Sequence, residues 1–283
     1  MEEKIKQLEK ILKKTENALV AFSGGVDSSY LLYKAKECLG ENLLAVTAAL
    51  EVHTEEEQET ACRVAGEIGV EHLVVHPRIL DKSEFANNQP SRCYHCKREL
   101  FCCFKEIAVR RNLAVVYDGA NADDQEDFRP GKRAAEELKV QSPLQKAGLT
   151  KKEIRQLSKR AGLSVWDRPA SPCLATRFPY GEKITADKLQ MVAAAEKSLR
   201  FFLQSRGDTG IDLRVRFHDG LARIEVPPEK IPDLIEKKEA VSACFRELGF
   251  AYITLDLQGF RSGSMNETLP EKSKFRYNNN KNW

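Results

Sequence analysis

The sequence predicts an α/β domain built on a parallel sheet, followed by a smaller α+β domain. Three observations predict this fold class. Short apolar runs alternate with amphipathic helical stretches over the first 162 residues, which is typical of βαβ units. Residues 163–181 contain three prolines and no clear period, as expected of an ordered linker. Beyond them, two alternating segments flank Asp219-Gly220, a strong hairpin signal.

In the first domain, strands and helices are expected to alternate along the chain. The strands are near-continuous apolar runs, typical of a sheet covered on both faces, and they occupy residues 18–22, 43–50, 71–76 and 113–119. Amphipathic patterns predict helices in the opening segment MEEKIKQLEKILKK and at about 28–39, 54–68 and 94–111. A further helix, 150–162, begins at the N-cap Thr150 and ends at Gly162.

In the second domain, a helix is expected to precede a small antiparallel sheet. The helix covers residues 184–204, strands follow at 213–218 and 222–226, and another helix, at about 228–248, leads to a last strand, 250–257. The predicted division of the chain is a first domain 1–165, a linker 166–182 carrying Cys173, a substrate-binding and oligomerisation domain 183–268, and a polar tail 269–283.

The composition indicates a globular protein of balanced charge. Of 283 residues, 42% are hydrophobic and 31% are charged, and 45 basic against 42 acidic residues give a net charge of +3. This balance makes nucleic acid an unlikely partner. No apolar run reaches the length of a membrane span, and the charged N-terminus lacks a signal-peptide pattern. We therefore expect a cytoplasmic protein that does not engage membranes, whose eight cysteines are reduced.

A glycine-rich loop follows the first predicted strand and opens a helix, with the sequence Ser-Gly-Gly-Val-Asp-Ser-Ser at 23–29. Tandem glycines allow a sharp turn and close approach to a ligand. Loop amides, hydroxyls and the positive helix end suit an oligophosphate, and Asp27 suits the Mg²⁺ that accompanies it. The loop is neither a Walker A motif nor a dinucleotide fingerprint; the alternative is an ordinary glycine-rich turn. The expected nucleotide-binding residues are Ser23, Gly24, Gly25, Asp27, Ser28 and Ser29.

Acidic residues follow the fourth predicted strand. Asp118 and Gly119 end that strand, and Asp123 and Asp124 come shortly after them. In open α/β sheets, ligands bind at the carboxyl ends of strands. Asp118, Gly119 and Asp123 are therefore expected to assist in binding the nucleotide and its Mg²⁺, the alternative being an acidic surface loop.

The string S-G-G-V-D-S resembles the PP-loop of the N-type ATP pyrophosphatases, which include GMP synthetase, NAD synthetase and the tRNA thiolases. The resemblance implies a Rossmann-like fold of the adenine nucleotide alpha hydrolase type. It also implies that ATP is cleaved between its α- and β-phosphates, which gives an adenylylated substrate and pyrophosphate.

Further motifs narrow the resemblance. DGANADD (118–124), CLATRFPYG (173–181), RVRFH (214–218) and LDLQGFRSG (255–263) follow in an order and spacing similar to the LarE family, sulfurtransferases that mature the nickel-pincer cofactor of lactate racemase. The resemblance extends from about residue 5 to residue 268. It implies a homo-oligomer whose substrate is a pyridinium dicarboxylate mononucleotide, one carboxylate of which is adenylylated and converted to a thiocarboxylate.

Three cysteines are candidates for handling sulfur. Cys93 and Cys96 form a C-x-x-C pair on a predicted helix, and Cys173 lies in the linker. Three thiolates would leave one iron of a [4Fe–4S] cluster open, an arrangement that resembles the iron–sulfur members of the LarE family and implies a separate sulfur donor. Other members give up the sulfur of a single cysteine, which would be Cys173 here. A zinc site that includes His95, or a structural pair, is a further alternative.

An anionic substrate requires cationic partners. Arg177 follows Cys173 closely enough to favour its thiolate, and Lys97 is suited to phosphate or to the adenylylation transition state. The alternatives are a solvated helix lysine and a solvated sheet face on which arginines pair with Glu225 or Asp256. The candidate substrate residues are Arg129, Arg177, Glu196, Arg214, Arg216 and Arg261.

Two other functions use the same motifs. A cluster-dependent tRNA thiolase would share the activation step, but it would need a basic RNA-binding surface. A nucleotide sensor or cluster carrier would bind ATP without turnover. Release of pyrophosphate in the presence of substrate separates the enzymes from the carrier.

Overall fold

The computed structural model describes residues 1–125, 131–169, 171–203 and 211–261, which form two compact units. The first unit takes in Met1–Ile79 and Cys93–Ala170, and the second takes in Leu80–Arg92 and the chain from Ser171 onward. Residues 80–92, which the sequence assigned to the first domain, are grouped with the second unit.

The first unit contains a four-stranded parallel sheet in the order β3-β2-β1-β4. Its strands are β1 (Ala18–Ala21), β2 (Leu43–Ala48), β3 (Glu71–Val75) and β4 (Val116–Tyr117). The chain runs outward from β1 to β3 and then returns to β4 on the other side of β1. The carboxyl ends of β1 and β4 are therefore a topological switch point, where open α/β sheets bind ligands.

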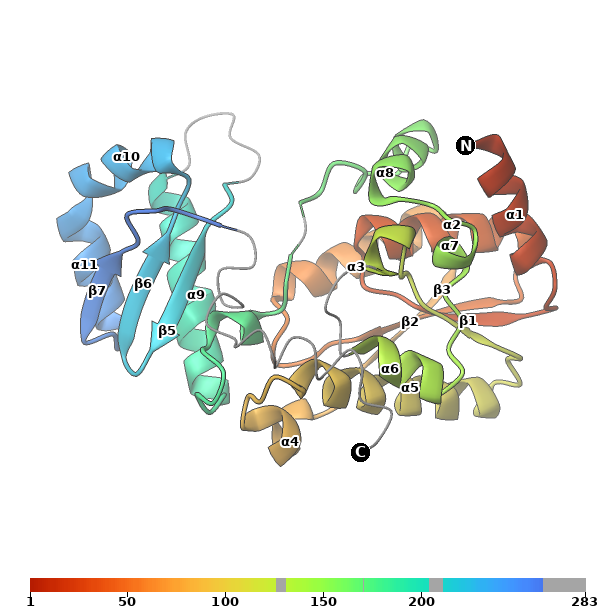
Figure 1. The fold of residues 1–283 in the computed structure, drawn as a ribbon, viewed down its shortest axis with the longest axis horizontal. Helices are drawn as coiled ribbons and strands as arrows, with labels where there is room; N and C mark the ends of the chain where they lie inside the picture. Colours follow the sequence, from red (N-terminus) through yellow and green to blue (C-terminus); the bar gives the residue numbers. More distant parts are fainter. Residues whose placement is uncertain (126–130, 170, 204–210, 262–283) are drawn as a thin grey trace. The chain divides into compact units, whose positions relative to one another are not determined.

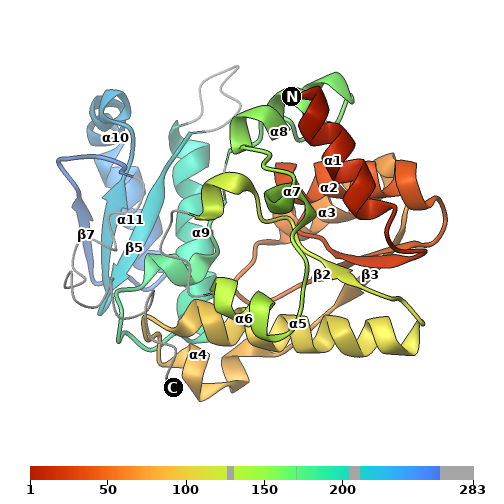
Figure 2. The same cartoon turned by 45° about the vertical axis from the view of Figure 1, so that its right-hand side comes forward.

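Helices cover both faces of this sheet (Figures 1 and 2). One face carries α1 (Glu2–Leu12), α2 (Val26–Leu39), α3 (Glu55–Ile68), α7 (Pro143–Lys146) and α8 (Lys151–Arg160), and the other carries α5 (Arg92–Arg110) and α6 (Gly131–Glu137). The core is apolar and includes Leu12, Val20, Leu31 and Leu144, all without exposed surface. The predicted α/β class is confirmed. In the ranges that the structure describes, no helix combines the length and apolarity needed to cross a membrane.

Side-chain caps define two helix starts in this unit. Thr54 and Thr150 each form a capping box, with Glu57 and Glu153 respectively. Each box satisfies two backbone N–H groups that would otherwise lack partners. The start predicted at Thr150 is confirmed. Lys4 of α1 forms a 2.8 Å ion pair with Glu153, which joins the first turn of α8 to α1.

The second unit contains a three-stranded sheet in the order β5-β6-β7, with β5 (Arg214–His218), β6 (Leu221–Glu225) and β7 (Tyr252–Leu255). The hairpin at Asp219-Gly220 makes β5 and β6 antiparallel, as predicted. The expectation of a wholly antiparallel sheet is wrong, because β6 and β7 are parallel. Two helices, α10 (Ile231–Glu236) and α11 (Lys238–Glu247), stand where one was expected, and a helical crossover of this kind joins parallel strands. The long helix α9 (Ala186–Leu203) precedes the sheet.

The segment 80–92 is anchored in the second unit by hydrogen bonds of its side chains and its backbone. It contains the short helix α4 (Ser83–Ala86). Asn88 is fully buried and donates from its side-chain amide to the carbonyls of Phe178 and Pro179, at 3.3 and 2.7 Å. The carbonyl of Ala86 accepts from Ile184 N at 2.8 Å. The part of the chain that the structure describes also contains four short 3₁₀ turns: η1 (Ile79–Asp81), η2 (Ala122–Gln125), η3 (Leu174–Arg177) and η4 (Pro228–Lys230).

Candidate functional site

The glycine-rich loop lies between β1 and α2. Gly24 has a φ of +69°, and a Cβ at this position would lie 2.8 Å from the Cα of Ala61 in α3. Only glycine meets both restrictions at low cost. Ser28 Oγ donates to the carbonyl of Gly25 at 3.1 Å and accepts from Ser23 N at 3.3 Å. The loop is therefore held in a tight turn at the N-terminus of α2, a position that favours phosphate.

The segment after β4 lies against this loop. A Cβ at Gly119 would lie 3.0 Å from Ser28 N, so glycine allows the two backbones to approach. Asp118 is buried, and its Oδ1 accepts from Ala120 N at 3.3 Å. Asp123 is held nearby, since its N–H donates to Asn121 Oδ1 at 2.9 Å. The structure thus brings together the two segments that the sequence assigned to nucleotide binding.

Asp27 occupies the first turn of α2, and its two carboxylate oxygens differ in their surroundings. Oδ2 forms an ion pair with Lys151 Nζ, whereas Oδ1 is buried and has no hydrogen-bond partner among the described residues. Burial raises the pKa of Asp27, and the Lys151 ammonium opposes that rise. A buried carboxylate oxygen without a partner suits a hard cation, and Mg²⁺ usually takes one or two carboxylates together with phosphate oxygens and water. Asp27 therefore fits a Mg²⁺ that is bound with ATP.

Lys151 is a residue of this site that the sequence analysis missed. It is the first residue of α8, and its backbone N–H donates to Asp123 Oδ2 at 2.8 Å while its ammonium reaches Asp27. The N-cap Thr150 identified the start of the helix in the sequence. No pattern in the sequence linked that start to an aspartate 124 positions earlier, because the packing of α8 against α2 brings the two together.

The C-x-x-C pair lies in the first turns of α5. Cys93 is exposed and Cys96 is half-buried. Helix α6 supports this turn, since Tyr94 Oη donates to Glu137 at 2.7 Å and the Arg133 guanidinium lies 5.2 Å from the Tyr94 ring. In the described ranges, no three His, Cys, Asp or Glu side chains are grouped so that they could hold a metal ion. Cys173 belongs to the second unit.

Lys97, the residue after Cys96, is half-buried and lies beside α6. A Cβ at Gly131 would lie 2.5 Å from Lys97 Cδ. The Lys97 ammonium lies 5.9 Å from the centre of the Phe101 ring. These contacts place its stem against the backbone of α6, and its predicted role with phosphate stays a prediction.

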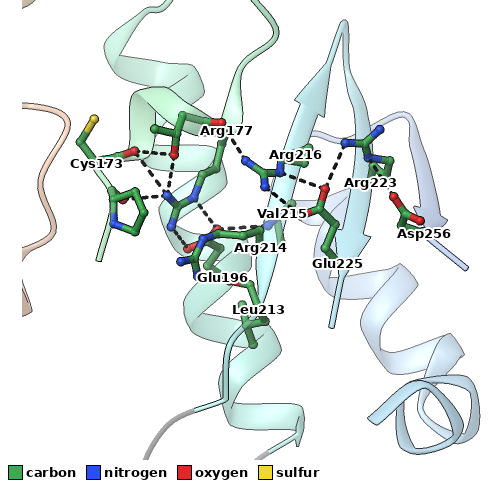
Figure 3. Close-up of polar contacts among 12 residues, drawn as sticks. Cys173, Arg177, Glu196, Leu213, Arg214, Val215, Arg216, Arg223, Glu225 and Asp256 are labelled. Atoms are coloured by element: carbon green, nitrogen blue, oxygen red, sulfur yellow. Dashed lines mark hydrogen bonds and ion pairs between the residues drawn. The ribbon is translucent and has the colours of Figure 1, made fainter. Parts of the chain in front are cut away.

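Cys173 caps η3 in the second unit, and its backbone is tightly held. Its carbonyl accepts from Thr176 N at 3.0 Å, from Thr176 Oγ1 at 2.9 Å and from Arg177 Nη1 at 3.3 Å. Figure 3 shows its sulfur pointing away from these hydrogen bonds. The half-buried thiol thus stands on a backbone turn whose position is set by Arg177.

Arg177 and Glu196 form a bidentate ion pair, with Nε–Oε1 and Nη2–Oε2 distances of 2.8 and 3.1 Å (Figure 3). Their side chains are only 3% and 4% exposed. Glu196 Oε1 also accepts from Val215 N at 3.1 Å. Burial alone would raise the pKa of Glu196, but the Arg177 guanidinium outweighs it and lowers that pKa. The remaining Arg177 donors reach the carbonyls of Pro172 and Cys173 and the hydroxyl of Thr176.

Arg216 is likewise held by protein groups. It forms a bidentate pair with Glu225, at 3.0 and 2.8 Å, and its Nη1 donates to the carbonyl of Thr176 at 2.8 Å. Arg223 donates to the same Glu225 at 3.0 Å and lies 3.7 Å from Asp256. The pairing of arginines with Glu225, expected as an alternative, is present. This face of the sheet is buried rather than solvated, since Arg216 is 5% exposed.

Arg214 differs from its neighbours on the same strand. It is 7% exposed and donates to the carbonyl of Leu213 at 2.6 Å, and its guanidinium lies 5.0 Å from the centre of the Phe260 ring. Within the described ranges it forms no ion pair with a carboxylate. Burial, together with the charges of Arg177 and Arg216, lowers the pKa of Arg214 to about 10. A buried cation with cationic neighbours and no carboxylate partner is suited to an anionic ligand.

Of the last two candidate arginines, the structure describes Arg261 and not Arg129. Arg261 is half-buried and follows β7 at the end of the described residues. Arg129 lies outside the described residues, as do the last two residues of the segment LDLQGFRSG (255–263).

Comparison with known proteins identifies relatives of this chain. Residues 6–123 match a family model described as asparagine synthase. The chain is 40% identical to an uncharacterised protein of Synechocystis sp., over 95% of this chain and 99% of the relative. It is 39% identical to the pyridinium-3,5-bisthiocarboxylic acid mononucleotide synthase of Lactiplantibacillus plantarum, over 91% and 92%. An uncharacterised protein of Methanocaldococcus jannaschii is 28% identical over 88% and 92%.

Proposed function

Since the chain belongs to the LarE family, a PP-loop family of ATP-dependent sulfurtransferases, we propose that it converts a carboxylate of a pyridinium dicarboxylate mononucleotide to a thiocarboxylate. The observation that carries this proposal is the junction of the glycine-rich loop, Asp27 and the Asp118–Asp123 segment at the switch point of the sheet. The loop amides and hydroxyls, the Asp27 carboxylate and the segment after β4 lie together there, which supports binding of ATP with Mg²⁺.

The first stage of the reaction is adenylylation. A substrate carboxylate oxygen attacks the α-phosphorus of ATP, and the bond between that phosphorus and the bridging oxygen to the β-phosphate breaks. Pyrophosphate leaves with the bonding electron pair. The loop amides and the N-terminus of α2 stabilise the negative charge on the departing group. Asp27 would hold Mg²⁺, which supplies charge neutralisation at the phosphates.

The second stage exchanges oxygen for sulfur. A sulfur nucleophile forms a bond to the activated carboxyl carbon, and the bond to the AMP oxygen breaks. Arg214 is the arginine best placed to bind an anionic group of the substrate, because it has no carboxylate partner in the described residues. The guanidinium groups of Arg177 and Arg216 donate to Glu196, Glu225 and the backbone of residues 172–176. These contacts support a positioning role around Cys173 for both arginines.

The activity is testable with purified protein, MgATP and the pyridinium dicarboxylate mononucleotide. We expect AMP and pyrophosphate in equal amounts, and a product whose mass reports exchange of one oxygen for sulfur when sulfide is supplied. Omitting the mononucleotide should stop pyrophosphate release, because the carboxylate is the attacking group. Release of inorganic phosphate and ADP instead of pyrophosphate and AMP would contradict the proposed reaction.

A second part of the proposal concerns the source of the sulfur. We propose that Cys93, Cys96 and Cys173 hold a [4Fe–4S] cluster, whose iron without a protein ligand would carry the extra sulfide. The donor chemistry fits, because thiolates are the ligands such clusters prefer and two of the three cysteines stand one helical turn apart on α5 with exposed or half-buried side chains. The alternative is sacrifice of the Cys173 sulfur.

Metal analysis separates these two sulfur sources. Anaerobically purified protein is expected to hold about four iron atoms and four acid-labile sulfides per chain, and the Cys93→Ala/Cys96→Ala/Cys173→Ala variant none. Cys62→Ala, an exposed cysteine on α3, is the matched control. Protein that stays free of iron after anaerobic reconstitution, and in which Cys173 loses the mass of its sulfur after one turnover, would show the sacrificial route instead.

A further inference from the structure

The phosphate-binding loop has no cation of its own. Residues 23–29 contain serine, glycine, valine and aspartate, whereas a Walker A loop contributes a lysine to the phosphates. The loop also carries the negative charge of Asp27. A triphosphate bound here would therefore meet amides, hydroxyls and a carboxylate, and its charge requires a cation from another part of the chain.

Among the described residues, Lys151 places an ammonium at this loop. Its ammonium pairs with Asp27 Oδ2 in the first turn of α2, at the end of the helix that faces the loop. The two side chains keep 35% and 20% of their surface exposed, so neither is sealed in the core. Lysine suits such a task, because its ammonium is a compact charge on a flexible stem.

The backbone of Lys151 is fixed even though its ammonium can move. Its N–H donates to Asp123 Oδ2 at 2.8 Å, and the capping box of Thr150 and Glu153 holds the same turn. The ion pair between Lys4 and Glu153 ties that turn to α1. A rotation of the side chain can therefore redirect the charge without moving the helix.

Magnesium and the Lys151 ammonium compete for Asp27. A divalent ion bound at this carboxylate would repel an ammonium on the adjacent oxygen, and the triphosphate that accompanies the ion offers the ammonium new anionic acceptors. We propose that Lys151 is a phosphate-binding residue of the ATP site, which pairs with Asp27 when no nucleotide is bound and transfers to the β- and γ-phosphates when MgATP binds. This inference rests on the proposed ATP site.

Binding measurements test the inference without turnover. Calorimetric titrations would measure the dissociation constants of ATP, pyrophosphate and AMP with Mg²⁺ and with EDTA. Lys151→Met is expected to weaken MgATP and magnesium pyrophosphate about 10- to 100-fold, the range for a lost charge-assisted contact, and to leave AMP within about twofold. Lys151→Arg should keep most of the affinity, and Lys152→Met, an exposed neighbour on the same helix, should match wild type.

A second set of titrations is made without magnesium, on a variant that keeps Lys151. In EDTA, Asp27→Asn should bind metal-free ATP more tightly than wild type, because it removes a carboxylate and releases Lys151 to the phosphates. The Asp27→Asn/Lys151→Met double variant should lose that gain. If Lys151→Met binds MgATP and pyrophosphate as wild type does and changes only the melting temperature, Lys151 is a structural partner of Asp27 and the inference is wrong. Failure of the wild-type protein to bind ATP would instead refute the proposed ATP site itself.

Discussion

Replacing Asp27 with asparagine is expected to lower the rate of pyrophosphate release by about a thousandfold or more, because the site loses the carboxylate that would hold Mg²⁺ against the phosphates. Asparagine keeps the shape of the side chain but not its charge, and magnesium prefers carboxylate oxygen. The measurement is substrate-dependent pyrophosphate release at saturating ATP, with thermal unfolding followed in parallel.

The matched control for Asp27 is Asp187→Asn. Asp187 is exposed and also lies in the first turn of a helix, α9, so the variant repeats the change in charge without the loop. It should keep wild-type activity. Full activity in the Asp27→Asn protein would mean that the glycine-rich loop is not the nucleotide site.

Replacing Glu196 with alanine is expected to destabilise the protein by about 3–5 kcal/mol, the usual cost of leaving one member of a buried ion pair without its partner. Arg177 would keep its buried position with neither of its two contacts to the carboxylate, and Val215 N would lose an acceptor. Urea unfolding followed by circular dichroism would measure this change. Glu239→Ala, on the exposed first turn of α11, should change the free energy of unfolding by less than about 0.5 kcal/mol.

The pH dependence of the same pair has a definite sign. The pKa of Glu196 is lower in the folded protein than its ordinary value of 4.5, so the pair stabilises the fold at pH values above about 4.5. That contribution is lost as the pH falls through the folded-state pKa. The difference in stability between wild type and Glu196→Gln should therefore be largest near neutral pH and shrink in acid. An equal difference at pH 3 and pH 7 would contradict the ion-pair explanation.

The backbone of Cys173 should respond to the same substitution. Arg177 holds the carbonyls of Pro172 and Cys173, and Glu196 holds Arg177. Loss of Glu196 should therefore change the rate at which iodoacetamide modifies Cys173, whereas a purely distant destabilisation would leave that rate unchanged below the unfolding transition. This readout distinguishes positioning of the cysteine turn from general stability.

The parts of this protein that could be predicted from the sequence are those whose chemistry is contiguous in the chain. The loop at 23–29 could be predicted because its glycines, hydroxyls and aspartate act within one turn between a strand and a helix. The start of α8 followed from Thr150, since an N-cap side chain acts on the backbone N–H groups of the adjoining turn. The parallel sheet followed from apolar runs alternating with helices, a pattern set by burial on both faces.

Which distant groups face one another could not be predicted, because it depends on how the helices and strands pack. Lys151 meets Asp27 only because α8 packs against α2, and residues 80–92 belong to the second unit because the buried Asn88 bonds carbonyls about 90 positions later. In the sequence, the arginines of β5 form a polar stripe. In the structure, Arg216 pairs with Glu225, whereas Arg214 has no carboxylate partner in the described residues. Local patterns report propensity and periodicity, but the free energy of a buried charge depends on the neighbour that folding places beside it.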